Sequence, residues 1–316
     1  MMNLAILGAG RIACTMARTV NRMEDVNLYA VASRSLERAE SFAKEYNIEK
    51  AYGSYEEMLQ DKNVDLVYIA TPHSHHCEHM KICADYGKPM LCEKAFTVTA
   101  KEAEEAIAYA KERNILVAEA MWVRYMPMTK TLKEILASGR IGEVIGLTAN
   151  LGYAIMDKER IFRPELGGGA LLDLGVYTLN FATTVFGDDV KKIDSSVVKH
   201  DTGIDKKEFV NLTYENGEMA GLFNTAETVS DRKGVIYGTK GYIMVDNINN
   251  YEAFHIYNQQ HELEETIERP EQITGFEYQV RTCKRALEEG KLECEEMPHA
   301  HTIKIMQIIE EVRKAW

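Results

Sequence analysis

The sequence has few features of an exported or disulfide-stabilised protein. Its 316 residues contain only six cysteines, and no two of them form a Cys-x-x-Cys pair. Scattered cysteines in a long chain are typical of reduced thiols in a cytosol. The N-terminus lacks the charged and then apolar pattern of a secretory leader, and no uninterrupted apolar run approaches the about 18–20 residues that span a bilayer. We therefore expect a cytoplasmic protein that is neither exported nor anchored in a membrane.

The sequence also has fewer basic than acidic residues. The chain has 37 Lys and Arg residues against 49 Asp and Glu residues, which gives a formal net charge of -12. This balance argues against a general nucleic-acid binder and against a protein that binds an anionic membrane surface. Any anionic ligand must therefore be held by local groups. The length and the 46% hydrophobic content predict a globular protein of about two domains.

A glycine-rich turn lies near the start of the chain. Residues 3–7 have a strand pattern and are followed by residues 8–13, GAGRIA, and then by an amphipathic helix pattern. This is the GxGxxA fingerprint, in which glycines allow a tight turn and a close approach of the backbone to a pyrophosphate. The residues expected to contact a dinucleotide here are Gly8, Gly10, Arg11 and Ile12.

Strand and helix patterns then alternate as far as residue 120. The strand-like runs are residues 26–33, 64–71 and 88–93, and the helical runs between them are residues 36–46 and 76–87. Alternation of this kind is typical of a parallel sheet. We predict an α/β protein with an NAD(P)-binding, doubly wound Rossmann domain in residues 1–120.

The end of the second predicted strand favours NADP. An NAD site usually has an acidic residue there for the ribose 2′-hydroxyl, whereas a basic residue accommodates a 2′-phosphate. This chain has Ser33 and Arg34, which can both bind a phosphate. In the alternative interpretation Arg34 is a solvated loop residue, and Glu37 reaches the ribose of NAD.

Glu93 and Lys94 follow the run 88–93. If this run is the next parallel strand, the pair lies at its carboxyl end, where open α/β sheets bind ligands. The positive charge of an oxidised nicotinamide would disfavour a charged lysine beside it, so that Lys94 could exchange protons near neutral pH. The alternative is a surface salt bridge at a strand end.

Residues 73–79, HSHHCEH, are rich in metal-ligating side chains. Their density raises the possibility of zinc, but the cluster begins a helix, on which only His75 with His79 or His76 with His79 can face the same way. No second ligand set with standard spacing follows. We interpret the cluster as capping, packing and solvent-exposed residues and expect no metal.

A second candidate group lies in the apolar helix pattern of residues 170–186. Asp173 and Tyr177 are four residues apart and project from one face of such a helix. A buried Asp173 needs a donor, which a catalytic lysine or a substrate hydroxyl would provide. Tyr177 could equally be a half-buried aromatic residue whose hydroxyl bonds to backbone.

From residue 144 onward, alternation with hairpin signals predicts a half-exposed sheet, followed by two amphipathic helices. The predicted strands lie within residues 144–153, 191–200, 207–227, 231–247 and 252–259, and the helices within 275–290 and 301–316. We assign residues 121–316 to one substrate-binding and oligomerisation domain. Trp122, at its start, either lines the pocket or packs between domains.

Several spaced motifs together resemble the glucose-fructose oxidoreductase and inositol dehydrogenase family, written Gfo/Idh/MocA. They are the glycine fingerprint, ATP at 70–72 followed by His76, GKPMLCEK at 87–94 and GGGALLDLGVY at 167–177. EAMWVRYMP at 119–127, and Tyr177 where many relatives have histidine, are most similar to the dimeric dihydrodiol dehydrogenase branch. Ala95 replaces the proline of the family's Glu-Lys-Pro motif, which leaves the backbone at Lys94 less restricted.

The resemblance implies a Rossmann domain and a second α/β domain with an open, mainly antiparallel sheet that often forms a dimer. It implies hydride exchange between NAD(P) and a carbinol carbon. It assigns catalysis to Lys94, Tyr177 and Asp173. Further cofactor contacts are expected at Thr71, Pro72, His76, Glu93 and Lys94, and substrate contacts at Trp122, Arg124, Asp173 and Tyr177.

We therefore predict an NADP-dependent oxidoreductase that acts on a secondary alcohol of a sugar, polyol or cyclic diol, and a homodimer or higher homo-oligomer. In one arrangement Tyr177 is the base and ammonium Lys94 stabilises its phenolate; in the other, Lys94 is the base and Tyr177 orients the hydroxyl. The alternatives are an NAD-linked inositol or sugar dehydrogenase and a non-catalytic NAD(P)-sensing regulatory protein.

Overall fold

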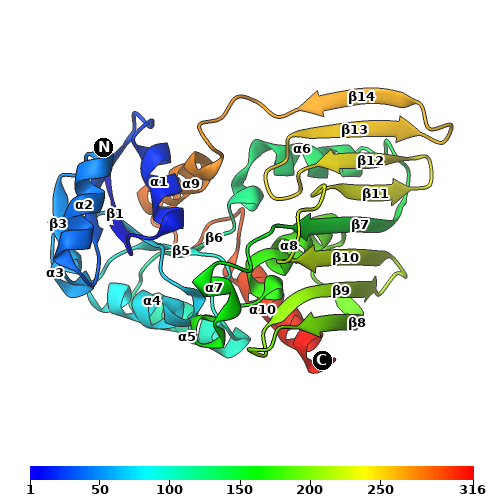
Figure 1. The fold of residues 1–316 in the computed structure, drawn as a ribbon. Coiled ribbons are helices and arrows are strands. Elements are labelled where there is room, and N and C mark those ends of the chain that lie inside the picture. Colours follow the sequence, from blue (N-terminus) through cyan, green and yellow to red (C-terminus); the bar gives the residue numbers. More distant parts are fainter. The chain divides into compact units, whose positions relative to one another are not determined.

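The computed structural model describes residues 1–316, which divide into two compact units (Figure 1). The first unit comprises residues 1–125 and 272–303, and the second comprises residues 126–271 and 304–316. The boundary inferred from the sequence, between residues 120 and 121, assigned all later residues to one domain. In the structure, residues 272–303 lie with the first unit instead.

The first unit is built on a six-stranded, all-parallel sheet with the strand order β3-β2-β1-β4-β5-β6. The strands are β1 (Met2–Leu7), β2 (Val26–Ala32), β3 (Lys50–Tyr52), β4 (Leu66–Ile69), β5 (Met90–Glu93) and β6 (Val117–Ala120). Every residue of β4, β5 and β6 is buried, as expected for a parallel sheet that is covered on both faces. The predicted Rossmann fold is confirmed.

The helices of this unit form two packed groups, one of α1, α2 and α9 and one of α4 and α5. They are α1 (Arg11–Val20), α2 (Leu36–Tyr46), α3 (Tyr55–Leu59), α4 (His76–Asp85), α5 (Ala100–Glu112) and α9 (Phe276–Glu288), with short 3-10 turns η1 (His73–His75) and η2 (Trp122–Tyr125). Ser35 caps α2, and Thr99 forms a capping box with Glu102 on α5. These caps fix where the helices leave the strand ends.

The second unit contains an eight-stranded mixed sheet with the order β14-β13-β12-β11-β7-β10-β9-β8. Its strands are β7 (Val144–Gly152), β8 (Val190–Lys199), β9 (Asp205–Tyr214), β10 (Met219–Thr225), β11 (Gly234–Gly238), β12 (Gly241–Asp246), β13 (Ala253–Asn258) and β14 (Leu263–Glu268). Only the pair β7 and β10 is parallel. The open, mainly antiparallel sheet is therefore confirmed. β14, whose residues are mostly exposed, had no clear pattern in the sequence.

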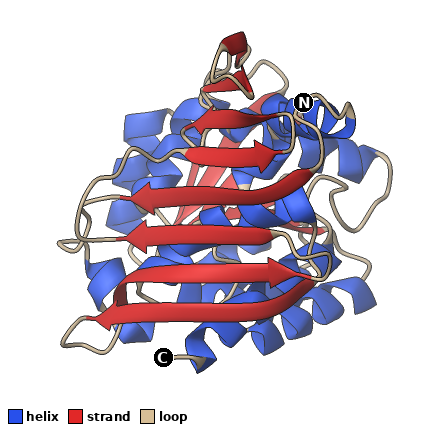
Figure 2. Cartoon of the chain, turned by 90° about the vertical axis from the view of Figure 1, so that its right-hand side faces the viewer, coloured by secondary structure: helices blue, strands red, loops and turns tan.

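Helix α8 (Val176–Phe186) packs against β7, β10 and α6 (Pro127–Ala137). The other helical segments are α7 (Glu159–Phe162), η3 (Pro164–Leu166), η4 (Leu171–Gly175) and α10 (His299–Lys314), which begins in the first unit and ends in the second. The prediction of one continuous α-helix over 170–186 is wrong in its first part, because η4 is a π-helix. Figure 2 shows that no helix covers the sheet face toward the viewer.

One helical stretch of the second unit is long and apolar enough to cross a membrane by length and composition. It runs through Pro164–Phe186 with a mean hydropathy of 1.2, but 89% of this window is buried inside the protein. Such burial is typical of a core helix. We therefore interpret the stretch as part of the core of the second unit.

Candidate functional site

The glycine turn after β1 is shaped for close backbone approach. Gly8 has φ 103°, and a Cβ atom there would lie 2.9 Å from Cγ2 of Thr71. Gly10 precedes α1. The first N–H groups of a helix have no partner within it, and no side chain caps this turn. A helix start of this kind binds anions. The turn therefore fits the pyrophosphate of a dinucleotide.

Two arginines, Arg34 and Arg38, gather at the end of β2. Both are exposed, and Arg38 donates from Nε and Nη2 to the carbonyl oxygen of Ala9 at 3.2 and 2.8 Å. Burial raises the pKa of the Tyr55 hydroxyl, and the charges of Arg34 and Arg38 oppose this rise, which places all three groups near one another. Ser33 is buried at the strand end. Arg38 was missed in the sequence, although its place four residues after Arg34 on a helix start could have indicated it.

His76 connects the loop after β4 with the loop after β5. It is completely buried; its Nε2 lies 2.8 Å from the carbonyl oxygen of Thr71, and its Nδ1 lies 3.0 Å from that of Ala95. Burial lowers the pKa of His76, and these backbone carbonyls oppose that shift. A neutral imidazole donates through only one of its two nitrogens. His76 thus supports both loops from behind.

The other histidines of this segment are also engaged. Nδ1 of His79 lies 2.9 Å from the hydroxyl of Thr71, and the rings of His75 and His79 stack at 5.6 Å. Burial, with the neighbouring charges of His75, His76 and Arg34, lowers the pKa of His79 to about 4. His79 is therefore neutral at physiological pH and takes part in packing and hydrogen bonding around the loop.

Glu93 and Lys94 end β5, as the sequence indicated. Tyr68 donates its hydroxyl hydrogen bond to Oε1 of Glu93, and the backbone N–H of Lys94 donates to Oε2 at 3.2 Å. Glu93 is buried, and Lys94 is half-buried. The peptide bond between Lys94 and Ala95 is cis. The Glu93 carboxylate thus binds the backbone at Lys94 and a neighbouring strand.

A further acid lies beside this pair on β6. Glu119 pairs in register with Cys92 of β5 and is only 2% exposed. Burial raises the pKa of Glu119 to about 7, against the opposing effects of Thr302, Arg124 and Lys94. Its position near Lys94 was missed because strand pairing, and not sequence proximity, brings the two together.

Trp122 and Arg124 follow β6 in η2, and both are buried. The ring of Trp122 packs on Phe276 of α9, with 4.6 Å between the centroids. Phe276 belongs to the same unit, so this contact is packing within the first unit. The expected role of both residues in substrate binding stays a prediction.

In the second unit, Asp173 lies in the π-helix η4, and Tyr177 lies in the first turn of α8. Both are 7% exposed. The sequence suggested a lysine or a substrate hydroxyl as the donor for Asp173. In the structure, Nη1 of Arg160, from α7, lies 2.8 Å from Oδ1 of Asp173, and the expected lysine or substrate hydroxyl stays a prediction. Arg160 was missed because it lies outside the GGGALLDLGVY motif.

Buried carboxyl groups from β9 support this π-helix from behind. Oδ2 of Asp205 accepts the backbone N–H of Leu171 at 2.6 Å, and Oε1 of Glu208 would lie 3.1 Å from a Cβ atom on Gly175. Burial raises the pKa of both carboxyl groups. Long-range contacts therefore fix the backbone that carries Asp173, and π-turns occur often at functional sites.

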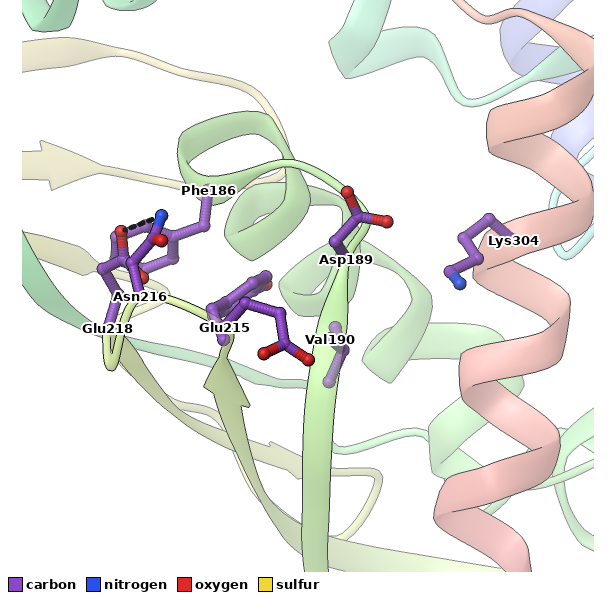
Figure 3. A pocket seen from close by; sticks show the side chains of 8 residues that line it. Phe186, Asp189, Val190, Glu215, Asn216, Glu218 and Lys304 are labelled. Atoms are coloured by element: carbon purple, nitrogen blue, oxygen red, sulfur yellow. Dashed lines mark hydrogen bonds between the residues drawn. The ribbon is translucent and has the colours of Figure 1, made fainter.

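A cavity of about 460 Å³ in the second unit is a separate feature (Figure 3). Its lining includes the acidic residues Asp189, Glu215 and Glu218, and Lys304 of α10 lies across the open space from Asp189. Lys191 forms an ion pair with Glu215 at 3.3 Å. None of the residues that we associate with chemistry lines this cavity.

Comparisons with known proteins agree with this geometry. The profile described as "Oxidoreductase family, NAD-binding Rossmann fold" matches residues 2–121, and the Gfo/Idh/MocA C-terminal domain profile matches residues 129–244. The chain belongs to the Gfo/Idh/MocA family. It is therefore an NAD(P)-binding oxidoreductase, and the family membership inferred from its motifs is confirmed.

Relatives within the Gfo/Idh/MocA family point to alcohol and keto chemistry. The trans-1,2-dihydrobenzene-1,2-diol dehydrogenase of Mus musculus is 32% identical and covers 98% of this chain and 95% of its own length. The human enzyme of the same name is 33% identical over 94% of this chain and 91% of its own length. The sequence-based similarity to the dihydrodiol dehydrogenase branch is thus confirmed.

Solved structures show the same fold. KijD10, a 3-ketoreductase from Actinomadura kijaniata in complex with NADP and TDP-benzene, has a TM-score of 0.90 and 24% identity over 99% of this chain and 97% of its own. The aldose-aldose oxidoreductase of Caulobacter crescentus, complexed with glycerol, has a TM-score of 0.88 and 22% identity over the same shares of both chains. Both likenesses concern the fold alone.

Proposed function

We propose that this protein is an NADP-dependent oxidoreductase that transfers a hydride between the nicotinamide and a secondary alcohol carbon of a sugar, polyol or cyclic diol. The observation that carries the proposal is the strand order β1-β4-β5. Gly8, Thr71 and Lys94 follow these three adjacent parallel strands, so their loops share one edge of the sheet. Ligands of open α/β sheets bind at this edge.

The preference for NADP rests on the groups around β2. Ser33, Arg34 and Arg38 offer a hydroxyl and two guanidinium groups, and a guanidinium binds phosphate through paired donors. Arg38 also bonds to Ala9 of the glycine turn, which fixes its side chain beside the cofactor loop. These groups favour a 2′-phosphate over a free 2′-hydroxyl.

In this mechanism the bound nicotinamide supplies the hydride acceptor. Lys94 or Tyr177 takes the hydroxyl proton as general base. Arg160 pairs with Asp173, the residue that we expect to bind a second substrate hydroxyl. Glu93 and His76 hold the loop of Lys94 through backbone contacts.

The substrate class is supported by the relatives. The dihydrodiol dehydrogenases are named for a cyclic diol, and the structural neighbours are named for a 3-ketoreductase and an aldose-aldose oxidoreductase. A panel of cyclic diols, polyols and aldoses, followed at the NADPH absorbance, tests the proposal. Turnover with at least one class supports it, and no cofactor-dependent turnover across the panel would contradict it.

The cofactor preference has its own test. Replacing the guanidinium in Arg34→Ala should lower kcat/KM for NADP about 10- to 100-fold and leave that for NAD nearly unchanged. Arg113→Ala, which removes an arginine that pairs with Asp85 on the surface, is the matched control. An equal loss with both cofactors would contradict the assignment of Arg34 to the 2′-phosphate.

We further propose that two copies of the chain associate through the uncovered face of the second unit's sheet (Figure 2). Alternation along β9 buries Val210 and leaves Phe209 55% exposed, and Met219 on β10 is also 55% exposed. Phe209 stacks on Phe223 at 4.6 Å. Phe209→Lys should give monomers in light scattering; an unchanged mass would contradict this interface.

A further inference from the structure

Glu119 has an unusual environment for a buried carboxyl group. It lies on β6, with Cys92 of β5 as its register partner, and both of its carboxylate oxygens are buried without a partner in hydrogen-bond geometry. Glu277, also buried, accepts the backbone N–H groups of Ile273, Thr274 and Gly275 at 2.7 to 3.1 Å. Glu277 is thus a structural carboxylate that caps a loop, and Glu119 has no comparable structural task.

Charged groups face Glu119 from each neighbouring element. Arg124 of η2 and Lys94 after β5 favour its ionised form, whereas Glu93 disfavours it. The side chain of Thr302 of α10 also favours the ionised form, and its effect on the pKa of Glu119 is larger than that of any of these charges. These contributions oppose the cost of burial, which is the largest effect. The outcome is a carboxyl group that can lose its proton near neutral pH.

Tyr125 also lies beside Glu119. Its hydroxyl donates to the backbone oxygen of Glu119 at 2.7 Å and not to the carboxylate. Burial raises the pKa of Tyr125 well above its ordinary value, and Cys283, Cys294 and Glu119 add to the rise. Tyr125 therefore stays neutral, and it does not compete with Glu119 as a proton-exchanging group.

We propose that Glu119 is a positioning residue that acts through Lys94, because its buried carboxyl group lies on β6, beside the end of β5 that leads into Lys94. The carboxylate form attracts the ammonium form of Lys94, and the protonated form does not. The inference rests on the proposed function, in which Lys94 is one of the two groups that can take the proton of the alcohol. Glu119 itself does not contact the reacting atoms.

The inference predicts a coupled titration that can be measured without turnover. In carbon-13 glutamate spectra, the signal that is lost in Glu119→Gln should titrate near pH 7 in the wild-type protein. In Lys94→Met the same signal should titrate at higher pH, because an attractive positive charge has been removed. An unchanged midpoint in Lys94→Met would overturn the coupling.

The pH profile of kcat/KM gives the functional readout. We expect an inflection near pH 7 in the wild-type enzyme that disappears in Glu119→Gln and returns in Glu119→Asp. At the pH where the difference is largest, kcat/KM of Glu119→Gln should differ from wild type about tenfold. Glu112→Gln, an exposed change on α5 of the same unit, is the matched control. A profile of Glu119→Gln that matches wild type would overturn the inference.

Different results would refute the proposed function and the role of Glu119. If Lys94→Met retains wild-type turnover, the assignment of Lys94 is wrong, whatever the spectra show for Glu119. If Lys94→Met loses turnover while Glu119→Gln keeps both the wild-type rate and the inflection, the proposed function stands and only the role of Glu119 is refuted.

Discussion

The two units place their candidate residues by different means. In the first, Gly8, Thr71 and Lys94 lie on loops after adjacent parallel strands, and the sheet itself is buried on both faces. In the second, Asp173 lies in a π-helix that is held from behind by Asp205 of β9. The comparison teaches that strand order alone brings the first set together, whereas the second set depends on a long-range contact.

Tyr177→Phe tests whether the second unit contributes to the chemistry at all. Loss of the hydroxyl should lower kcat by about two to four orders of magnitude, the usual contribution of a general acid or base, and leave NADPH binding unchanged. Tyr86→Phe, an exposed tyrosine, is the control. Turnover near the wild-type level would mean that the first unit alone supplies the proton acceptor.

Glu119→Gln tests how a buried carboxyl group of the first unit changes the stability of the protein with pH. Burial raises the pKa of Glu119 to about 7 from an ordinary value of 4.5, so the folded state binds more protons than the unfolded state between these values. The stability of the wild-type protein therefore falls as pH rises through this window, by about 3 kcal/mol.

The Gln variant lacks this titration. The difference between its unfolding free energy and that of the wild type should thus grow in favour of the variant from pH 4.5 to pH 8 in urea titrations. A difference that does not change with pH would show that Glu119 has an ordinary pKa.

Asp205→Ala tests the long-range support of the π-helix. The change leaves the backbone N–H of Leu171 without its acceptor, which should cost about 2 kcal/mol of stability. Amide hydrogen exchange at Leu171 should become faster. Asp201→Ala, in the exposed loop before β9, is the control and should leave this amide protected. Unchanged exchange in Asp205→Ala would mean that the turn is stable without Asp205.

Much of the first unit could be predicted from the sequence. The glycine fingerprint and the alternating patterns fixed β1, β2, β4 and β5 closely, and the rule for parallel strand ends located Glu93 and Lys94. Glu119 was missed because its proximity to Lys94 arises from the pairing of β5 with β6. Arg38 was missed because its bond to Ala9 joins segments 29 residues apart.

Less of the second unit could be predicted from the sequence. Most of its strands had clear alternation, but the π-helix η4 has the apolar pattern of an α-helix. Its backbone is bonded to Asp205 of β9, a contact that the local pattern does not contain. Likewise, Asp173 forms an ion pair with Arg160, thirteen residues earlier, which no motif included. Local patterns predict elements well, whereas side-chain partners depend on how distant elements pack.

The central claim is that turnover requires the amine of Lys94 for proton transfer from a bound alcohol. The most direct measurement compares the NADPH dissociation constant and the turnover number of Lys94→Met with those of the wild type. We expect NADPH binding to stay within about twofold and turnover to fall by about two to four orders of magnitude. Wild-type turnover in Lys94→Met would contradict the claim.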